Sequence, residues 1–183
     1  MEKFHDSVDL CILAEELIQY ESPSELLVLG TLAHVAPRIL KVGSCISDPI
    51  VSTGNSMLAG CQQAVSFARG LLWSLVDRLV HALPRNPVWE HVDDLSQPLT
   101  AHSANALRIK LVTAGTIVGE EVHRLKLKLS DKSVVVPISV ATQRAAFELG
   151  NLVPPVLLRV ANSFDDVGVE MSGGRRRMAK AQN

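Results

Sequence analysis

The chain has 183 residues, of which 47% are apolar, and its formal net charge is −1. This length suits one domain with a real core, the apolar content argues against disorder, and the charge gives no overall attraction to nucleic acid. No apolar run is long enough to cross a bilayer, and the N-terminus lacks a signal-peptide pattern. The three widely spaced cysteines, Cys11, Cys45 and Cys61, are typical of reduced thiols in an intracellular protein, either cytoplasmic or nuclear.

The first half of the chain is dominated by helical patterns. Apolar residues at spacings of three and four predict a helix over Val8–Tyr20. Ser22-Pro23-Ser24-Glu25 has the pattern of a capping box and predicts a second helix that runs to His34. Arg38–Ile46 is typical of a strand. A long apolar stripe after Gly60 predicts the longest helix, which Pro84 ends.

The second half mixes hairpins with helices. His91-Val92-Asp93-Asp94 lies between short apolar runs and predicts a hairpin, which a helix over Ala101–Val118 follows. Alternating leucines and lysines in Leu125–Leu129, then Ser130-Asp131 and Val134–Val136, predict a second hairpin. The remaining patterns predict a helix at Thr142–Leu149 and strands at Val156–Val160 and Val167–Met171. The fold class is therefore α+β, with a mostly antiparallel sheet and helices packed on one face.

The adjacent carboxylates of Asp93 and Asp94 indicate a cation site. Neighbouring residues on a strand point to opposite faces, so two aspartates that share a metal ion belong in a turn. Adjacent negative charges repel, and a divalent cation neutralises them, as in polymerases that hold Mg²⁺. Aspartate is also a common turn residue, and an ordinary turn is the alternative. A second pair, Asp165-Asp166, precedes a short strand and is predicted to be such a turn.

The order of helix, aspartate hairpin, helix and lysine hairpin resembles the palm domain of a reverse transcriptase of the non-LTR retroelement and group II intron type. The resemblance covers residues 1–172 as a partial, polymerase palm-like domain, and residues 173–183 form a basic tail, expected to be flexible. It implies an RNA-directed DNA polymerase that uses two Mg²⁺ or Mn²⁺ ions. The implied partners are an RNA or DNA template-primer and a dNTP, and no membrane.

The resemblance also implies roles for individual residues. Asp93 and Asp94 match the metal-binding motif, although His91 replaces the usual aromatic residue or Met. Lys132 matches a lysine close to the triphosphate. Gly60 and Gln62 match a loop that packs against template and nucleotide, where the family more often has Pro-Gln-Gly than Ala59-Gly60-Cys61.

The N-terminus matches only the later part of the family's first motif. Asp6 matches the second aspartate of that motif, so the bridging aspartate would lie immediately before Met1. His5 occupies the place of an aromatic residue that stacks under the incoming sugar. Asp6 is the best replacement metal ligand, but it is equally suited to cap the helix that begins near Val8. Without the first aspartate and the fingers and thumb, the chain is expected to be inactive alone.

Two other interpretations remain open. In the first, the chain is a non-catalytic retroelement remnant with weak nucleic-acid binding. In the second, it is an unrelated α+β interaction domain. His34, His81, His102 and His123 show no metal-ligand spacing and are typical of surface or core positions. Trp73 and Trp89 lie in apolar runs, which predicts that they are core residues.

Overall fold

A computed structural model describes residues 4–51, 56–58, 61–130, 132–137, 159–161, 163–166 and 169–172. The chain divides into two units. The first contains Met1–Ser74, Glu90–Asp94 and His123–Lys128, and the second contains Leu75–Trp89, Leu95–Val122 and Leu129–Asn183. None of the helices in the described ranges is both long and apolar enough to cross a membrane.

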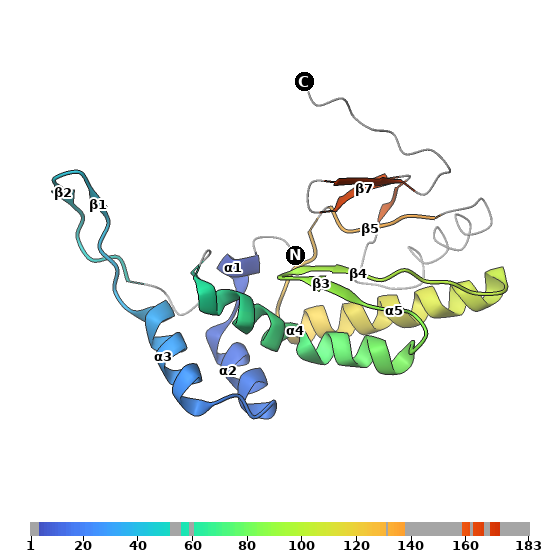
Figure 1. Ribbon diagram of the computed structural model, residues 1–183, viewed down its shortest axis with the longest axis horizontal. Coiled ribbons are helices and arrows are strands. Elements are labelled where there is room, and N and C mark those ends of the chain that lie inside the picture. The colour runs from blue at the N-terminus through green and yellow to red at the C-terminus, as the bar shows by residue number, and fades with distance from the viewer. Residues whose placement is uncertain are drawn as a thin grey trace, which may run out of the picture. The chain divides into compact units, whose positions relative to one another are not determined.

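The core of the first unit is built by helices (Figure 1). These are α1 (Phe4–Ser7), α2 (Leu10–Gln19), α3 (Ser24–Val35) and the first part of α4 (Gln62–Ala82). The buried side chains include Phe4, Val8, Leu13, Leu17, Phe67, Ala68, Leu71 and Leu72. Glycines let the helices approach closely. A Cβ on Gly70 would lie 2.3 Å from Leu17 Cδ2, and one on Gly30 would lie 2.3 Å from Phe67 Cζ.

The predicted helix over Val8–Tyr20 is confirmed as α2, and both of its ends are capped. Asp9 Oδ1 accepts hydrogen bonds from the Cys11 and Ile12 amides, so Asp9 is the N-cap and the capping role considered for Asp6 is wrong. Glu21 has a left-handed φ of 54°, and the amides of Glu21 and Ser22 donate to the Ile18 and Leu17 carbonyls. This is a Schellman C-cap with glutamate in the position that usually holds glycine.

The predicted capping box at Ser22-Pro23-Ser24-Glu25 is wrong, although the helix predicted to follow it is present. α3 begins at Ser24, its N-cap residue is Pro23, and no side chain caps its first turn. The physical reason is that the Ser22 amide already closes α2 by donating to the Leu17 carbonyl at 3.0 Å. Ser22 therefore belongs to the end of one helix and does not begin the next.

The single strand predicted for Arg38–Ile46 is instead a short antiparallel hairpin. β1 (Lys41–Val42) pairs with β2 (Cys45–Ile46), and an isolated bridge joins Arg38 to Ile50. Gly43 has a φ of +62°, which lets the chain reverse within the turn. The prediction missed this reversal because the apolar residues on both sides of Gly43 look like one continuous strand.

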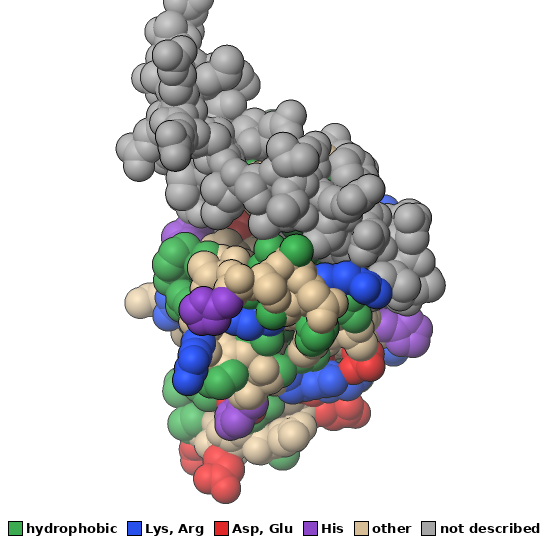
Figure 2. All heavy atoms as spheres, turned by 90° about the vertical axis from the view of Figure 1, so that its right-hand side faces the viewer, with side chains coloured by type: hydrophobic (Ala, Val, Ile, Leu, Met, Phe, Trp, Pro, Cys, Tyr) green, Lys and Arg blue, Asp and Glu red, His purple; other side chains and the backbone are tan. Residues whose placement is uncertain are grey.

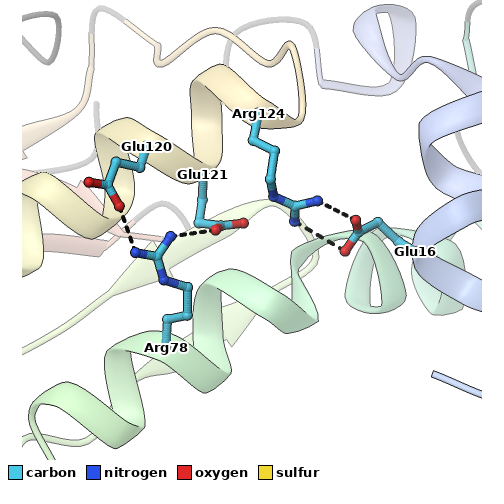
Figure 3. Close-up of polar contacts among 5 residues, drawn as sticks. All are labelled: Glu16, Arg78, Glu120, Glu121 and Arg124. Atoms are coloured by element: carbon cyan, nitrogen blue, oxygen red, sulfur yellow. Dashed lines mark hydrogen bonds and ion pairs between the residues drawn. The ribbon is translucent and has the colours of Figure 1, made fainter. Parts of the chain in front are cut away.

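The two long helices are confirmed, with revised ends for the second. The predicted stripe buries Leu71, Leu72, Leu75 and Leu79 of α4. α5 covers Ala104–Arg124 instead of Ala101–Val118, because Ser103 Oγ accepts from the Ala106 amide and fixes the start. Within the second unit, Arg78 of α4 donates to Glu120 and Glu121 of α5, each at 2.6 Å (Figure 3). The last turns of α5 therefore have partners that the sequence pattern did not reveal.

The expected α+β class is confirmed, and the described strands form four separate two-stranded sheets. The aspartate hairpin consists of β3 (Trp89–His91) and β4 (Asp94–Ser96), as predicted. Both tryptophans predicted to be core residues are exposed, Trp73 at 53% and Trp89 at 59%, so that prediction is wrong. The helix predicted at Thr142–Leu149 lies outside the described residues.

The predicted lysine hairpin is wrong. β5 (Val134–Val135) pairs in parallel with β6 (Arg159–Val160), and Leu125–Leu129 forms no strand. The alternation of the leucines and lysines is nevertheless real, because Leu125 and Leu127 are buried while Lys126 is exposed. The alternating pattern therefore predicted the burial of these side chains correctly and their strand pairing incorrectly.

Asp165-Asp166 does not form the predicted turn. β7 (Ser163–Asp166) pairs antiparallel with β8 (Val169–Ser172), and both aspartates lie within β7. The strand expected at Val167–Met171 corresponds to β8. Its partner strand was missed because two adjacent aspartates are unfavourable in a strand.

Candidate functional site

The aspartate pair lies at the turn of a tight hairpin. Val92 and Asp93 are the two connecting residues between β3 and β4, and Asp94 is the first residue of β4. A connection of two residues requires antiparallel strands. The side chain of Asp93 is half-buried and that of Asp94 is exposed. The sequence therefore predicted the hairpin and the turn position of Asp93 correctly, whereas Asp94, predicted to share the turn, begins β4.

The hairpin turn contains a strained residue. Val92 has a φ of 59°, in the left-handed region that β-branched residues rarely adopt. The strain costs on the order of 1–2 kcal/mol and must be offset by the rest of the structure. Glycine, asparagine or aspartate is the usual residue in this conformation. A valine directly before the aspartate pair is therefore a local departure from stable turn chemistry, of the kind found at functional sites.

Glu90 adds a third carboxyl group to the hairpin, and sequence reasoning missed it. Its side chain is half-buried, and its Oε1 atom is buried without a hydrogen-bond partner in the described part of the chain. Burial raises the pKa of this carboxyl group, and the positive charge of Arg69 opposes the increase. The alternation of β3 explains its burial, because Trp89 and His91 point to the exposed face and Glu90 to the other.

The N-terminal segment is joined by its backbone to the segment before α4. The amides of Ser56 and Met57 donate to the carbonyls of Val8 and His5, at 3.0 and 2.6 Å. The structure therefore brings His5 close to the segment that leads to Gln62, the exposed first residue of α4. Gly60, predicted to belong to the same loop against template and nucleotide as Gln62, lies outside the described residues.

The segment before α4 also contacts a buried histidine, His34. His34 is 0% exposed, and its Nδ1 atom accepts a hydrogen bond of 2.9 Å from the Leu58 amide. Its Nε2 atom is buried without a partner among the described residues, as is His5 Nδ1. Burial, and then the positive charge of Arg38, lower the pKa of His34. The sequence left surface and core positions open for His34; it is a core residue, and it holds the segment before α4.

The predicted ligands are not assembled into a three-carboxylate cluster. Asp6 is exposed on α1 and belongs to the same unit as Asp93 and Asp94. Within the described ranges, no group of three His, Cys, Asp or Glu side chains is placed to hold a metal ion. Asp93 and Asp94 alone offer the carboxylate oxygens that Mg²⁺ prefers, and Mg²⁺ commonly uses one or two carboxylates together with water and substrate phosphates. The two residues supply the type of ligand that such an ion uses.

Lys132 belongs to the second unit, whereas the aspartate pair belongs to the first. It lies in a turn next to β5, is exposed, and its amide donates to Ser130 Oγ at 3.2 Å. On the face drawn in Figure 2, the described basic side chains are interspersed with acidic and apolar ones. They form no continuous basic patch on the described part of that face.

Comparison of the chain with protein-family models, with curated proteins and with solved structures found no match.

Proposed function

We propose that Asp93 and Asp94 bind Mg²⁺ or Mn²⁺ and that the chain is a partial palm domain of an RNA-directed DNA polymerase. The observation that carries the proposal is the aspartate pair at the turn of the β3–β4 hairpin, beside the strained Val92. Two adjacent carboxylates in a turn provide a hard-oxygen site for a divalent cation. The cation would position the triphosphate of a dNTP for nucleotidyl transfer by a two-metal mechanism.

One backbone contact among the predicted residues supports this proposal. His5 and the Ser56–Met57 segment share backbone hydrogen bonds, so the proposed sugar-contacting residue adjoins the segment that leads to Gln62. Gly60 would continue this nucleotide path. Asp6 would be the third carboxylate once metal and nucleotide are bound. An RNA or DNA template-primer would lie along the same path.

Manganese binding tests the cation site directly. Bound Mn²⁺ broadens the amide NMR signals of nearby residues, so we expect selective loss of the signals of Glu90, Val92 and Leu95. Asp93→Asn and Asp94→Asn each remove one negative ligand and should abolish the selective broadening. The matched control is Asp165→Asn, because Asp165-Asp166 is also an adjacent pair but lies in a strand. Broadening that persists in the Asp93→Asn, Asp94→Asn double variant would refute the site.

A nucleotide titration tests the polymerase interpretation separately. Phosphates complete the coordination of Mg²⁺ and Mn²⁺, so a dNTP should tighten Mn²⁺ binding at the hairpin, by about tenfold or more. The control is the corresponding nucleoside, which lacks phosphates. Metal binding without any effect of the dNTP would retain the cation site and remove the nucleotidyl-transfer function, leaving the non-catalytic remnant.

One observation favours the unrelated interaction domain. α3 exposes several large apolar side chains, and exposed apolar patches of this kind commonly mark protein-binding surfaces. In that case the aspartate pair is only a turn. The Mn²⁺ experiment distinguishes the two functions, because an ordinary turn would bind Mn²⁺ weakly and show no more broadening near Asp93-Asp94 than near Asp165-Asp166.

A further inference from the structure

α3 is apolar on both of its faces. Its inner face carries Gly30 and His34, which are buried, and the His34 ring lies 5.6 Å from that of Phe67. Its outer face exposes four large apolar side chains at 55–62%: Leu26, Val28, Leu29 and Leu32. A helix that is apolar all round is normally covered all round. The outer face of α3 therefore has the composition of a buried surface.

The apolar surface continues onto the β1–β2 hairpin, which follows α3 directly in the chain and extends from its C-terminal end (Figure 1). Six large apolar side chains between Arg38 and Val51 are 50–78% exposed: Ile39, Leu40, Val42, Ile46, Ile50 and Val51. A lone two-stranded hairpin is marginally stable in water. Val42 and Ile46 point to opposite faces of the hairpin, so the apolar side chains lie on both of its faces. We call the ten side chains of α3 and the hairpin the α3–hairpin surface.

The α3–hairpin surface holds most of the large apolar side chains that the described chain exposes. Ten of the sixteen large apolar side chains that are exposed in the described chain belong to it. A stable protein–protein interface buries about 800 Å² per partner. Monomers rarely expose contiguous apolar patches larger than a few hundred Å². The surface is therefore expected to be covered in solution.

The charges around α3 suit a second copy of the same chain. No Asp, Glu, Lys or Arg lies between Leu26 and Pro37, so two such faces can meet without like charges in contact. Glu25 lies in the first turn of α3, and Arg38 lies beyond its other end, where the guanidinium donates to the His34 carbonyl. An antiparallel pair of α3 helices about a two-fold axis places each Glu25 close to the partner's Arg38. In a symmetric dimer this favourable contact occurs twice.

We propose that the α3–hairpin surface is the interface of a symmetric homodimer in which the two α3 helices pack antiparallel. The proposal goes beyond the cation site and does not depend on it. A lipid surface is a poorer match, because helices that bind membranes are rich in Lys and Arg, whereas Arg38 and Lys41 beside the α3–hairpin surface are balanced by Glu25 and Asp48. A nucleic acid is a still poorer match, because a surface that binds nucleic acid needs positive charge to contact the phosphates.

Light scattering coupled to gel filtration tests the dimer in the full chain. We expect a dimer mass for the unchanged protein and a monomer mass for Leu29→Glu, which introduces two facing negative charges into the apolar contact. The matched control is Ile109→Glu on α5, because Ile109 is 59% exposed and Leu29 is 62% exposed. Ile109→Glu should remain dimeric. A monomer mass for the unchanged protein at 100 μM, or a dimer mass for Leu29→Glu, would overturn the proposal; so would a monomer that floats with anionic vesicles, which would assign the surface to lipid.

A charge exchange tests the antiparallel arrangement. Glu25→Arg places arginine against Arg38, and Arg38→Glu places glutamate against Glu25, so each variant alone should dimerise at least about tenfold more weakly. When the two variants are mixed, both contacts become Arg–Glu pairs, and a heterodimer should form. Circular dichroism of each variant checks that it is folded. Failure of the mixture to recover a dimer would overturn the antiparallel geometry, and a misfolded variant could not produce that recovery.

Discussion

Arg124, the last residue of α5, donates two hydrogen bonds to the carboxylate of Glu16 on α2 (Figure 3). Both residues belong to the first unit. Glu16 is 3% exposed, so its charge has lost nearly all contact with water and depends on the guanidinium. Planar bidentate pairing is the strongest form of such a contact. The pair joins segments that are 108 residues apart in the sequence.

Arg124→Met should therefore destabilise the protein by about 2 kcal/mol, because it leaves a buried carboxylate without its cation. The value is below that for a fully buried pair, since the Arg124 side chain is 43% exposed. Urea unfolding followed by circular dichroism measures the loss. Arg85→Met, at an exposed arginine outside the helices, is the control and should change stability by less than about 0.5 kcal/mol. The double variant Glu16→Leu, Arg124→Met should recover most of the loss; a double variant less stable than the single one would contradict this account.

The features predicted correctly from the sequence are those set by local patterns. The apolar spacing in α4 and the turn residues of the β3–β4 hairpin are both short-range signals, and the structure confirms both. The alternation in Leu125–Leu129 correctly separated buried leucines from the exposed Lys126. It failed to predict the strand pairing because β5 pairs with β6, a segment 24 or more residues further along the chain. Pairing depends on the partner, and an alternating pattern contains no information about it.

For the candidate site, too, only the features set by local sequence were predicted. The position of Asp93 in a turn followed from residue type and neighbours. The desolvation of Glu90 and the hydrogen bond from Leu58 to His34 depend on the packing of distant segments, and no sequence pattern marks them. The strain at Val92 was also hidden, because valine gives no signal of a positive φ. These features of the candidate site follow from tertiary structure and could not be predicted from the sequence.

Val92→Gly should stabilise the protein by about 1 kcal/mol, because glycine adopts a positive φ without the clash of a β-branched side chain. Thermal unfolding measures the change. Val65→Gly is the control, since Val65 is exposed in the helical interior of α4, where glycine should destabilise by about 1 kcal/mol. Loss of stability in Val92→Gly equal to that in Val65→Gly would show that Val92 is not strained in solution.

Stability should fall as the pH decreases from 7 to 5, because of His34. Burial lowers the pKa of His34 in the folded protein below its ordinary value of 6.5, so the unfolded chain binds the proton more readily. The contribution of neutral His34 is therefore complete above pH 6.5 and is lost as the pH falls below that value. Protonation would also place a hydrogen on Nδ1, where the Leu58 amide already donates. Urea unfolding at pH 8, 7, 6 and 5 measures this slope.

His34→Asn removes the titration and retains an acceptor for the Leu58 amide, so its stability should vary less between pH 7 and pH 5. His81→Asn is the control, because His81 is an exposed histidine on α4. Asp9 gives a separate effect at lower pH. The hydrogen bond from Lys126 lowers the pKa of Asp9 below 3.8, so its contribution is present above that value and is lost only in stronger acid. If the stability of His34→Asn fell between pH 7 and pH 5 as steeply as that of the unchanged protein, His34 would not be the cause of the pH dependence.

Gly30→Ala should destabilise the protein by about 1–3 kcal/mol, even though alanine favours helices more than glycine does. The added Cβ would lie 2.3 Å from Cζ and 2.9 Å from Cε2 of Phe67, and that ring is held in the core between α3 and α4. Gly70→Ala is a graded comparison, because its closest contact is the methyl end of Leu17, which can rotate away. We expect a smaller loss for Gly70→Ala. The double variant Gly30→Ala, Phe67→Leu should lose less stability than the two single variants together, because leucine removes the ring atoms that the new methyl group meets. Additive losses in urea unfolding would show that Gly30 and Phe67 are not in contact.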